Sequence, residues 1–280
     1  MTKVFHADHA NVFVINDGTV LYNNDCFAPG ISRAALTDLR CGHHANEEHF
    51  TLTHNILLLA LQDRVVLIDA GNGHTALPGA GQLSNNLMAA GFQPDDVTDI
   101  VLTHAHPDHI DGLIDARQQL VFPKAAIHLA KEEYAFWHAE NPDFSKSKNT
   151  LPALKSLQQH ICGTLALVQH RLQLFDGQTP LFDFLLPIAA PGHTPGHYLF
   201  EITTASESFI HMGDICHEAL VLFAQPEWGT VFDIDFTFAA QTRRKVLDDL
   251  AQSQQLVFGY HLPWPGFGHV VKENDRFAWR

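Results

Sequence analysis

The stretch VLTHAHPDHIDG, residues 101–112, places three histidines and two aspartates directly after an apolar run that is typical of a buried strand. In an extended segment, residues i and i+2 face the same side, so His104 and His106 can hold one metal ion together. The proline that follows favours a turn into a helix, from which Asp108 and His109 project in another direction and can serve a second ion. The stretch therefore predicts a pair of metal ions at the end of a strand.

Three later strands are also predicted to end at a residue that can bind a metal: His193, Asp214 and His261. Taken singly, each of them is better explained as ordinary polar surface, but their shared position at strand ends favours one common site. Imidazole nitrogen and carboxylate oxygen suit zinc, with manganese, iron and cobalt as alternatives. Seven ligands are enough for two ions with a shared water: His104, His106 and His193 for the first, Asp108, His109 and His261 for the second, and Asp214 as the bridge.

The rest of the chain predicts strands alternating with helices, which favours sheets packed inside and helices outside. The predicted strands cover residues 55–61, 65–69, 99–103, 125–129, 184–190, 198–203, 208–212 and 256–259. The predicted helices cover residues 83–90, 131–139 and 238–251.

Composition limits the partners of the protein. The 280 residues, 46% of them hydrophobic, can bury a substantial core, and we expect one domain over residues 1–280. The formal charge of −14 repels phosphate backbones and anionic membranes, so neither nucleic acid nor a membrane is expected as a partner. No apolar run approaches the roughly 20 residues that span a bilayer, and no secretory leader is recognisable, so a cytoplasmic location is expected. The basic cluster of Arg243, Arg244 and Lys245 is expected on a solvated helix face.

The motifs THAHPDH, PGHTPGH, MGD and GYHLPWPG occur in the order found in the metallo-β-lactamase superfamily, which the chain resembles from about residue 55 to its C-terminus. The resemblance implies an α/β (α+β) fold, the αββα sandwich, in which two mixed β-sheets are flanked by helices and the metals lie at one edge between the sheets. The ligands assigned above match those of the superfamily. Asp69, in the run LIDAG, matches the buried aspartate that supports the ligands from behind.

Within the superfamily, the chain most resembles the branch of methyl parathion hydrolase and the quorum-quenching lactonases. The segments HLPWPGFGHV and FDIDFTFAAQTRRKVLDDLA carry this resemblance. Enzymes that cleave β-lactams commonly have a cysteine where this chain has Asp214, and Cys216 lies two positions too late. The RNA-processing and flavin-linked branches fit less well, because they need a basic surface or additional domains. Relatives in the resembling branch often form dimers, so a homodimer is expected.

One difference from the lactonases concerns substrate chemistry. The best-known acyl-homoserine lactone lactonases have a tyrosine three residues after the bridging aspartate, and this chain has His217 there. We expect Asp108 and His217 to be catalytic, with Asp108 orienting the attacking hydroxide and His217 on the substrate side. Trp264 and Phe267, close to His261 in the sequence, are expected to line an apolar substrate pocket.

The sequence therefore predicts a dinuclear hydrolase of lactones or carboxylic esters, including N-acyl-homoserine lactones, with side activity on phosphotriesters. Its substrate is expected to be small, neutral and apolar. A hydrolase of organophosphates or thioesters is the alternative within the same chemistry. A metal-binding protein without catalysis is the alternative from another class, and it would require a missing ligand.

Overall fold

The computed structural model describes residues 2–7, 10–41, 49–74, 77–204 and 208–280, with side chains from residue 10 onward. Its first sheet has seven strands, which follow one another in chain order. The first four pair antiparallel and the last four pair parallel. The strands are β1 (Thr2–Ala7), β2 (Ala10–Asn23), β3 (His49–Leu61), β4 (Val65–Ile68), β5 (Asp99–Val101), β6 (Ala126–Ala130) and β7 (Leu172–Phe175).

The second sheet has five strands in the order β12-β11-β10-β9-β8, all antiparallel except the parallel pair β10 and β11. A separate hairpin, β13 with β14, follows at the C-terminus. The strands are β8 (Leu185–Ala189), β9 (Tyr198–Thr203), β10 (Ser208–His211), β11 (Leu256–Phe258), β12 (Phe267–Gly268), β13 (Val270–Glu273) and β14 (Arg276–Trp279).

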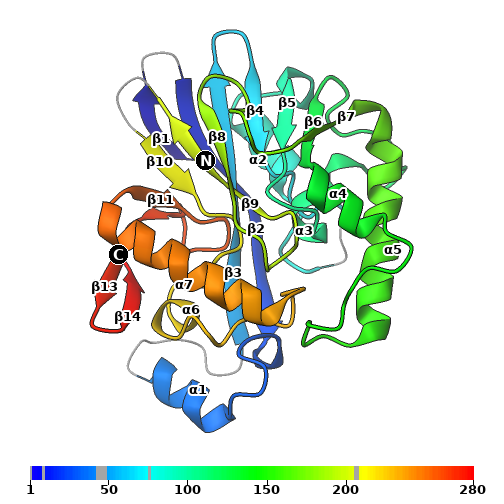
Figure 1. Cartoon of the computed structure of the whole chain (residues 1–280). Helices are drawn as coiled ribbons and strands as arrows, with labels where there is room; N and C mark the ends of the chain where they lie inside the picture. The colour runs from blue at the N-terminus through cyan, green and yellow to red at the C-terminus, as the bar shows by residue number, and fades with distance from the viewer. Residues whose placement is uncertain (1, 8–9, 42–48, 75–76, 205–207) are drawn as a thin grey trace.

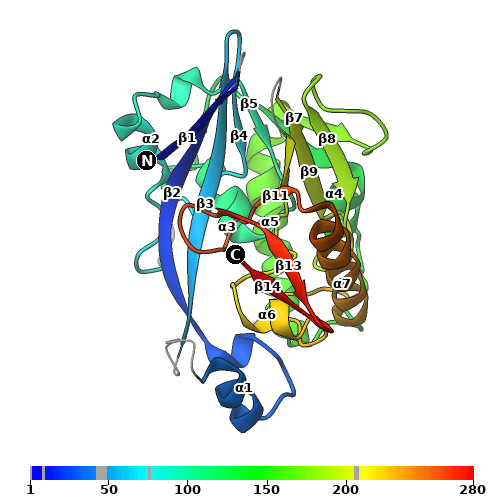
Figure 2. The same cartoon turned by 90° about the vertical axis from the view of Figure 1, so that its left-hand side faces the viewer.

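Helices cover the outer faces of both sheets. Figure 1 shows α4 and α5 on one side of the molecule and α7 on the other, and in Figure 2 α2 lies on the side opposite α7. The helices are α1 (Arg33–Arg40), α2 (Leu83–Ala89), α3 (Pro107–Ile110), α4 (Lys131–Trp137), α5 (Leu151–Val168), α6 (Val221–Ala224) and α7 (Phe236–Ser253). Short 3-10 turns cover Asn24–Cys26, Pro94–Asp96, Asp111–Leu113 and Gln169–Arg171.

The run NILLLAL in β3 shows why the chain folds in layers. Ile56 and Leu58 pack into the cluster beneath α2, α4 and α5, whereas Leu57 and Leu59 face the second sheet. Successive residues of a strand point to opposite faces, so a strand buried on both sides has a continuous apolar run. On the far side, Leu247 of α7 packs against the second sheet. The expected helix–sheet–sheet–helix sandwich is confirmed.

Most predicted elements are present with ends shifted by one or two residues. The strand expected over residues 99–103 pairs only as far as Val101. The sequence prediction missed the 18-residue α5, although Thr150 caps its first turn and a proline stands at its start. It also missed β1, β2, β7, β12, β13, β14, α1 and α6. No helix in the described part of the chain is long and apolar enough to cross a membrane.

Candidate metal centre

The quoted stretch turns from strand to helix as expected. An extended loop after β5 carries His104 and His106, and α3 carries Asp108 and His109. His106 has φ −65° and ψ 153°, an extended conformation, and directly precedes the helix. The proline occupies the first helical position, where its missing N–H costs no hydrogen bond. His106 and Asp108 consequently join different neighbours, whereas His104 and His109 both lie near Asp214.

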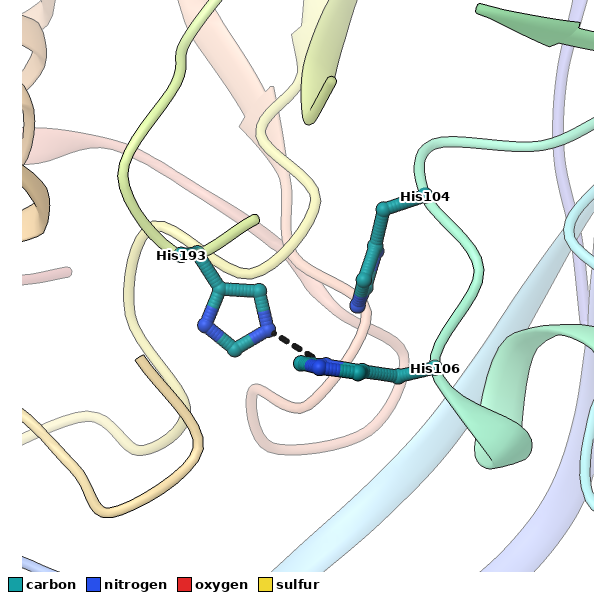
Figure 3. A group of neighbouring side chains, drawn as sticks. All are labelled: His104, His106 and His193. Carbon is teal, nitrogen blue, oxygen red and sulfur yellow. Dashed lines mark hydrogen bonds between the residues drawn. The ribbon is translucent and has the colours of Figure 1, made fainter. Parts of the chain in front are cut away.

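The first group of neighbours contains His104, His106 and His193, the last of these from the loop between β8 and β9. One ring nitrogen from each lies within 4.8 Å of the others, and all three side chains are buried. Nδ1 of His106 lies 2.9 Å from Nε2 of His193, as the dashed line in Figure 3 marks. The three rings thus converge from two loops that are far apart in the sequence (Figure 3).

Asp214 lies between this group and the remaining ligand candidates. Its Oδ2 is 3.4 Å from Nε2 of His193 and 3.3 Å from Nε2 of His261, and its Oδ1 is 3.3 Å from Nε2 of His109. Oδ2 of Asp108 is 3.3 Å from Nε2 of His261. One carboxylate therefore touches imidazoles of both expected sets, which is the position that a bridging ligand needs.

The protonation pattern of the imidazoles fits divalent ions. In four of the imidazoles the outer ring nitrogen, Nδ1, on the side away from the cluster, faces an oxygen atom. Nδ1 of His104 lies 3.1 Å from Thr103 Oγ1, and Nδ1 of His109 lies 2.9 Å from Asp69 Oδ2. Nδ1 of His193 lies 2.9 Å from Asp233 Oδ1, and Nδ1 of His261 lies 3.3 Å from the carbonyl oxygen of Thr53. A proton on each outer nitrogen leaves the inward Nε2 with a free lone pair. Among the described residues, the buried Nε2 atoms of His104, His106 and His109 have no hydrogen-bond partner, which is rare for buried polar atoms.

The carboxylates of the cluster favour positive charge near them. Burial alone would lower the pKa of His193, but Asp214 and Asp233 raise this pKa to about 9. Burial likewise opposes charge on His261, yet Asp214 and Asp108 raise its pKa to about 9. The cluster therefore attracts cations, whether these are protons or metal ions.

Comparison with known proteins agrees with this geometry. The family model for the metallo-beta-lactamase superfamily matches residues 50–261. The chain belongs to this superfamily. Among solved structures, AidC, a dizinc quorum-quenching lactonase in complex with a product, is 33% identical with a TM-score of 0.95, over 100% of this chain and 96% of AidC. The hydrolase AbOPH, of the beta-lactamase superfamily, is 28% identical with a TM-score of 0.90, over 98% of this chain and 95% of AbOPH.

Curated relatives are more distant. A probable metallo-hydrolase of Mycobacterium tuberculosis is 27% identical over 206 residues, which is 63% of this chain and 60% of that protein. The chain thus matches less than two thirds of the length of this relative. The probable metallo-hydrolase YflN of Bacillus subtilis is 29% identical over 72% of this chain and 76% of its own. The particular resemblance to methyl parathion hydrolase stays a prediction.

Asp69 supports the superfamily motif from behind. Its carboxylate accepts hydrogen bonds from the backbone N–H of Thr103 at 2.8 Å and from Nδ1 of His109 at 2.9 Å. Asp69 is fully buried and has a φ of 67°, a left-handed conformation that aspartate tolerates better than most residues. This conformation turns the chain sharply at the end of β4 and aims the carboxylate at the ligand loop.

Glu133 joins the two ligand-bearing loops, a role that the sequence analysis missed. Its Oε1 accepts from the backbone N–H of Ala105 at 2.9 Å and from Nε1 of Trp137 at 2.7 Å, and its Oε2 accepts from the backbone N–H of Gly196 at 2.9 Å. Burial raises the pKa of Glu133, whereas these donors lower it. One buried carboxylate in α4 therefore fixes the loop of His104 relative to the loop after β8.

Asp233 and Arg243 form a second support that the sequence analysis missed. Oδ1 of Asp233 faces His193, and its Oδ2 lies 3.2 Å from Nη2 of Arg243. Burial would raise the pKa of Asp233, but Arg243 and His193 hold it well below its usual range. The expectation that Arg243 lies on a solvated face is wrong: its side chain is buried and also donates to the carbonyl oxygens of Ile215 and Pro226.

The second histidine of PGHTPGH, His197, holds the backbone of the bridging aspartate. Its Nδ1 donates to the carbonyl oxygen of Ala190 at 3.1 Å, and its Nε2 accepts from the backbone N–H of Asp214 at 3.0 Å. Gly213, at a φ of 49°, leaves room for this ring, because a Cβ there would collide with Nε2 of His197. Gly213 therefore makes room for the ring of His197, and this ring in turn holds the backbone N–H of Asp214.

A pocket of about 290 Å³ opens onto the cluster. Its polar lining includes Asn72, Asn149 and Asp111, and none of the described residues that line it is a lysine or an arginine. His217 also lines it, with Nε2 3.3 Å from Oδ2 of Asp214 and its ring stacked on that of His261. The apolar walls consist of Tyr22, Leu52, Leu77, Ala153, Leu154, Leu157, Val231 and Phe232.

The expectation that Trp264 and Phe267 line this pocket is wrong. Trp264 is 40% exposed and Phe267 belongs to β12, where its ring packs against those of Phe209 and Phe258 at centroid distances of 5.3 and 5.0 Å. Neither is among the residues around the pocket. The chain turns away from the site after His261, so closeness in sequence does not become closeness in space.

Proposed function

We propose that the protein is a metal-dependent hydrolase that cleaves lactones or carboxylic esters, with N-acyl-homoserine lactones as the first substrates to test. The observation that carries the proposal is the position of the His and Asp cluster at the base of an apolar pocket with no lysine or arginine among its described lining residues. Membership of the superfamily and the 33% identity to the dizinc lactonase AidC support it.

Two divalent ions are proposed as cofactors, zinc first, with manganese, iron and cobalt as alternatives. Such ions lower the pKa of a bound water and polarise the oxygen that gains charge in the reaction. The proposed ligands are His104, His106 and His193 for one ion, Asp108, His109 and His261 for the other, and Asp214 between them.

The pocket is proposed to select a neutral, apolar substrate. Its walls come from four parts of the chain: the facing ends of β2 and β3, the segment between β4 and α2, the start of α5, and the segment before α7. An anionic substrate would meet the carboxylate of Asp111, which is not assigned to an ion, without a lysine or arginine among the described lining residues to offset it. An acyl chain, in contrast, gains about 0.8 kcal/mol for each methylene that the walls bury.

Asp108 and His217 are proposed to act on the reacting groups. Asp108 lies at the mouth of the cluster with its side chain 19% exposed, so its carboxylate can orient a nucleophilic water and accept a proton from it. His217 lies where substrate must enter, and among the described residues neither of its ring nitrogens has a hydrogen-bond partner. A neutral imidazole carries one N–H, which can donate to the leaving oxygen.

Phosphotriesters are proposed as side substrates. A nitrophenolate group leaves without protonation, so this reaction makes no demand on His217. Thioesters are the alternative acyl substrates, because their carbonyl carbon would lie beside the same proposed ions, Asp108 and His217.

The test is a hydrolysis panel with the full chain, before and after chelation. The panel contains an N-acyl-homoserine lactone, an aryl ester, a thioester, a nitrophenyl phosphotriester, a nitrophenyl phosphodiester and RNA. The proposal expects chelator-sensitive turnover of the lactone or the ester, and slower turnover of the phosphotriester. Preferential cleavage of the phosphodiester or RNA, or full activity in excess chelator, would overturn it.

A further inference from the structure

His54, in the middle of β3, is a buried histidine beside the cluster that none of the assignments above uses. Its side chain is fully buried, and within the described part of the chain its Nε2 has no hydrogen-bond partner. This nitrogen lies 3.8 Å from Oδ2 of Asp108, and its ring is T-shaped against that of His261 at 4.9 Å. His54, Asp108 and His261 together form a group that could hold an ion, so His54 is either another ligand or a donor.

The other ring nitrogen of His54 faces an amide whose orientation is fixed. Nδ2 of Asn72 lies 2.5 Å from Nδ1 of His54 and 2.8 Å from Oδ2 of Asp17. The same Oδ2 accepts the backbone N–H of Asn72 at 2.7 Å, and Oδ1 of Asp17 accepts the backbone N–H of Leu83. If the amide were rotated, its oxygen would face a carboxylate oxygen, so the NH₂ group must point toward both Asp17 and His54.

This arrangement gives His54 the opposite tautomer from its neighbours. The outer nitrogens of His109 and His261 face oxygen acceptors and carry the ring proton, which leaves their Nε2 free to bind an ion. The outer nitrogen of His54 faces a donor instead, so it must accept. The ring proton of His54 therefore lies on Nε2, the atom directed at Asp108.

We infer that His54 is a positioning residue, which directs its Nε2–H at the carboxylate of Asp108 across 3.8 Å, an electrostatic contact longer than a hydrogen bond, and is not a metal ligand. Three imidazole nitrogens lie near Oδ2 of Asp108: Nε2 of His261 at 3.3 Å, Nε2 of His109 at 3.7 Å and Nε2 of His54 at 3.8 Å. With an ion bound, the first two give their lone pairs to it and have no proton to donate. Only His54, of these three, presents a proton to the carboxylate, and this electrostatic contact favours one orientation of Asp108.

This inference rests on the proposed function, since it assumes that Asp108 helps to hold an ion. It extends the support of the site by a chain of contacts, from Asp17 through Asn72 and His54 to Asp108. Its members come from β2, the segment after β4, β3 and α3. Such contacts behind metal ligands typically change metal affinity or activity by about 10- to 100-fold when they are removed.

The tautomer is tested directly on the wild-type protein by ¹⁵N NMR of histidine rings, with and without zinc. The His54 signals are identified by their loss in His54→Gln. The inference expects a protonated Nε2 and an unprotonated Nδ1 in both states. A zinc-bound Nε2 in the loaded protein, or a proton on Nδ1, would overturn it.

The functional consequence is tested by chelator competition for zinc. His54→Leu removes the donor, whereas His54→Gln can place an N–H near the position of Nε2. We expect affinity for the second zinc to fall about 10- to 100-fold in the leucine variant and to return to within about 3-fold of wild type in the glutamine variant. His128→Leu is the control for loss of a buried histidine, because His128 pairs with Asp99 and belongs to no group of candidate ligands among the described residues.

The outcomes separate this inference from the proposed function. Wild-type protein that binds fewer than two zinc ions contradicts the proposed function itself. Wild-type protein that binds two, together with unchanged affinity in His54→Leu or equal losses in the leucine and glutamine variants, contradicts only the role of His54.

Discussion

Nδ1 of His193 lies 2.9 Å from Oδ1 of Asp233, whose other carboxylate oxygen faces the buried guanidinium of Arg243. The arginine thus holds the aspartate, and the aspartate sets both the orientation and the tautomer of the candidate ligand. The ion pair is completely buried, so each charge depends on the other. The site consequently depends on α7, which supplies no ligand.

We predict that Asp233→Asn weakens both the metal site and the fold. In either orientation, the new amide N–H points at an existing donor, and Arg243 loses its counter-charge. The free energy of unfolding should fall by about 3 to 5 kcal/mol, and zinc affinity by about 10- to 100-fold. Thermal denaturation and chelator competition measure the two effects. Asp235→Asn is the control: Asp235 caps α7 through the backbone N–H of Phe238, and asparagine caps a helix equally well. A similar loss in both variants would contradict the role given to Asp233.

Substitutions among the ligands should separate the bridge from the rest. Asp214→Ala should weaken binding of both ions, because this carboxylate contacts imidazoles of both groups. His193→Ala and His261→Ala should each weaken mainly one ion, and Asp69→Asn should reduce affinity or activity by about 10- to 100-fold. Zinc titration with two resolved binding steps measures the affinity for each ion in these variants. Small and equal effects at all four positions would show that the ligands are misassigned.

Glu133→Gln should misalign the two ligand loops. Both carboxylate oxygens accept from N–H groups, so a glutamine must turn its NH₂ toward one of these donors. We expect a loss of about 1 to 3 kcal/mol in the free energy of unfolding, accompanied by weaker zinc binding. The exposed neighbour Glu132 provides the control, and Glu132→Gln should change neither. Unaltered zinc affinity in Glu133→Gln would show that the loops are positioned without it.

The wall of the pocket formed by α5 should set the preference for acyl chain length. Each methylene that the pocket buries should raise kcat/KM by up to about 4-fold, since it contributes about 0.8 kcal/mol. Leu157→Ser should flatten this dependence, whereas Leu151→Ser should not, because Leu151 is 54% exposed and lies outside the lining. A lactone series of increasing chain length gives the measurement. An identical slope in the wild type and in both variants would place the acyl chain elsewhere.

His217→Ala should slow lactones more than nitrophenyl phosphotriesters. An alkoxide leaves poorly and gains from the N–H of His217, whereas nitrophenolate leaves without help. The ratio of kcat/KM between the two substrates, in wild type and variant, is the readout. An equal loss on both substrates would remove His217 from any role at the leaving group.

The candidate ligands could be found from the sequence because they occur in short motifs directly after predicted strands. The spacing from His104 to His109 determines which side chains pair, and the ends of neighbouring strands meet at one edge. The continuous apolar run over residues 55–61 likewise predicted a strand, and the structure buries both of its faces. The regular spacing of Leu154, Leu157 and Ile161 also marks α5, so this helix was predictable although it was missed.

The supporting residues were not accessible in this way. Glu133 acts on Gly196, 63 residues away, and His54 acts on Asp108, so their roles arise only when distant segments pack together. Nothing in the local sequence distinguishes Glu133 from the exposed Glu132 next to it. Trp264 illustrates the opposite error, since it stands three residues from His261 and yet is not among the residues that line the pocket.

The most direct test of the central claim is the metal content of the purified chain, measured together with hydrolysis of a lactone during zinc titration of chelated protein. We predict that activity is absent in the chelated protein and returns as zinc is added, with binding complete at two ions per chain. Full activity at one tightly bound ion per chain, or activity that persists with no bound metal, would contradict the account.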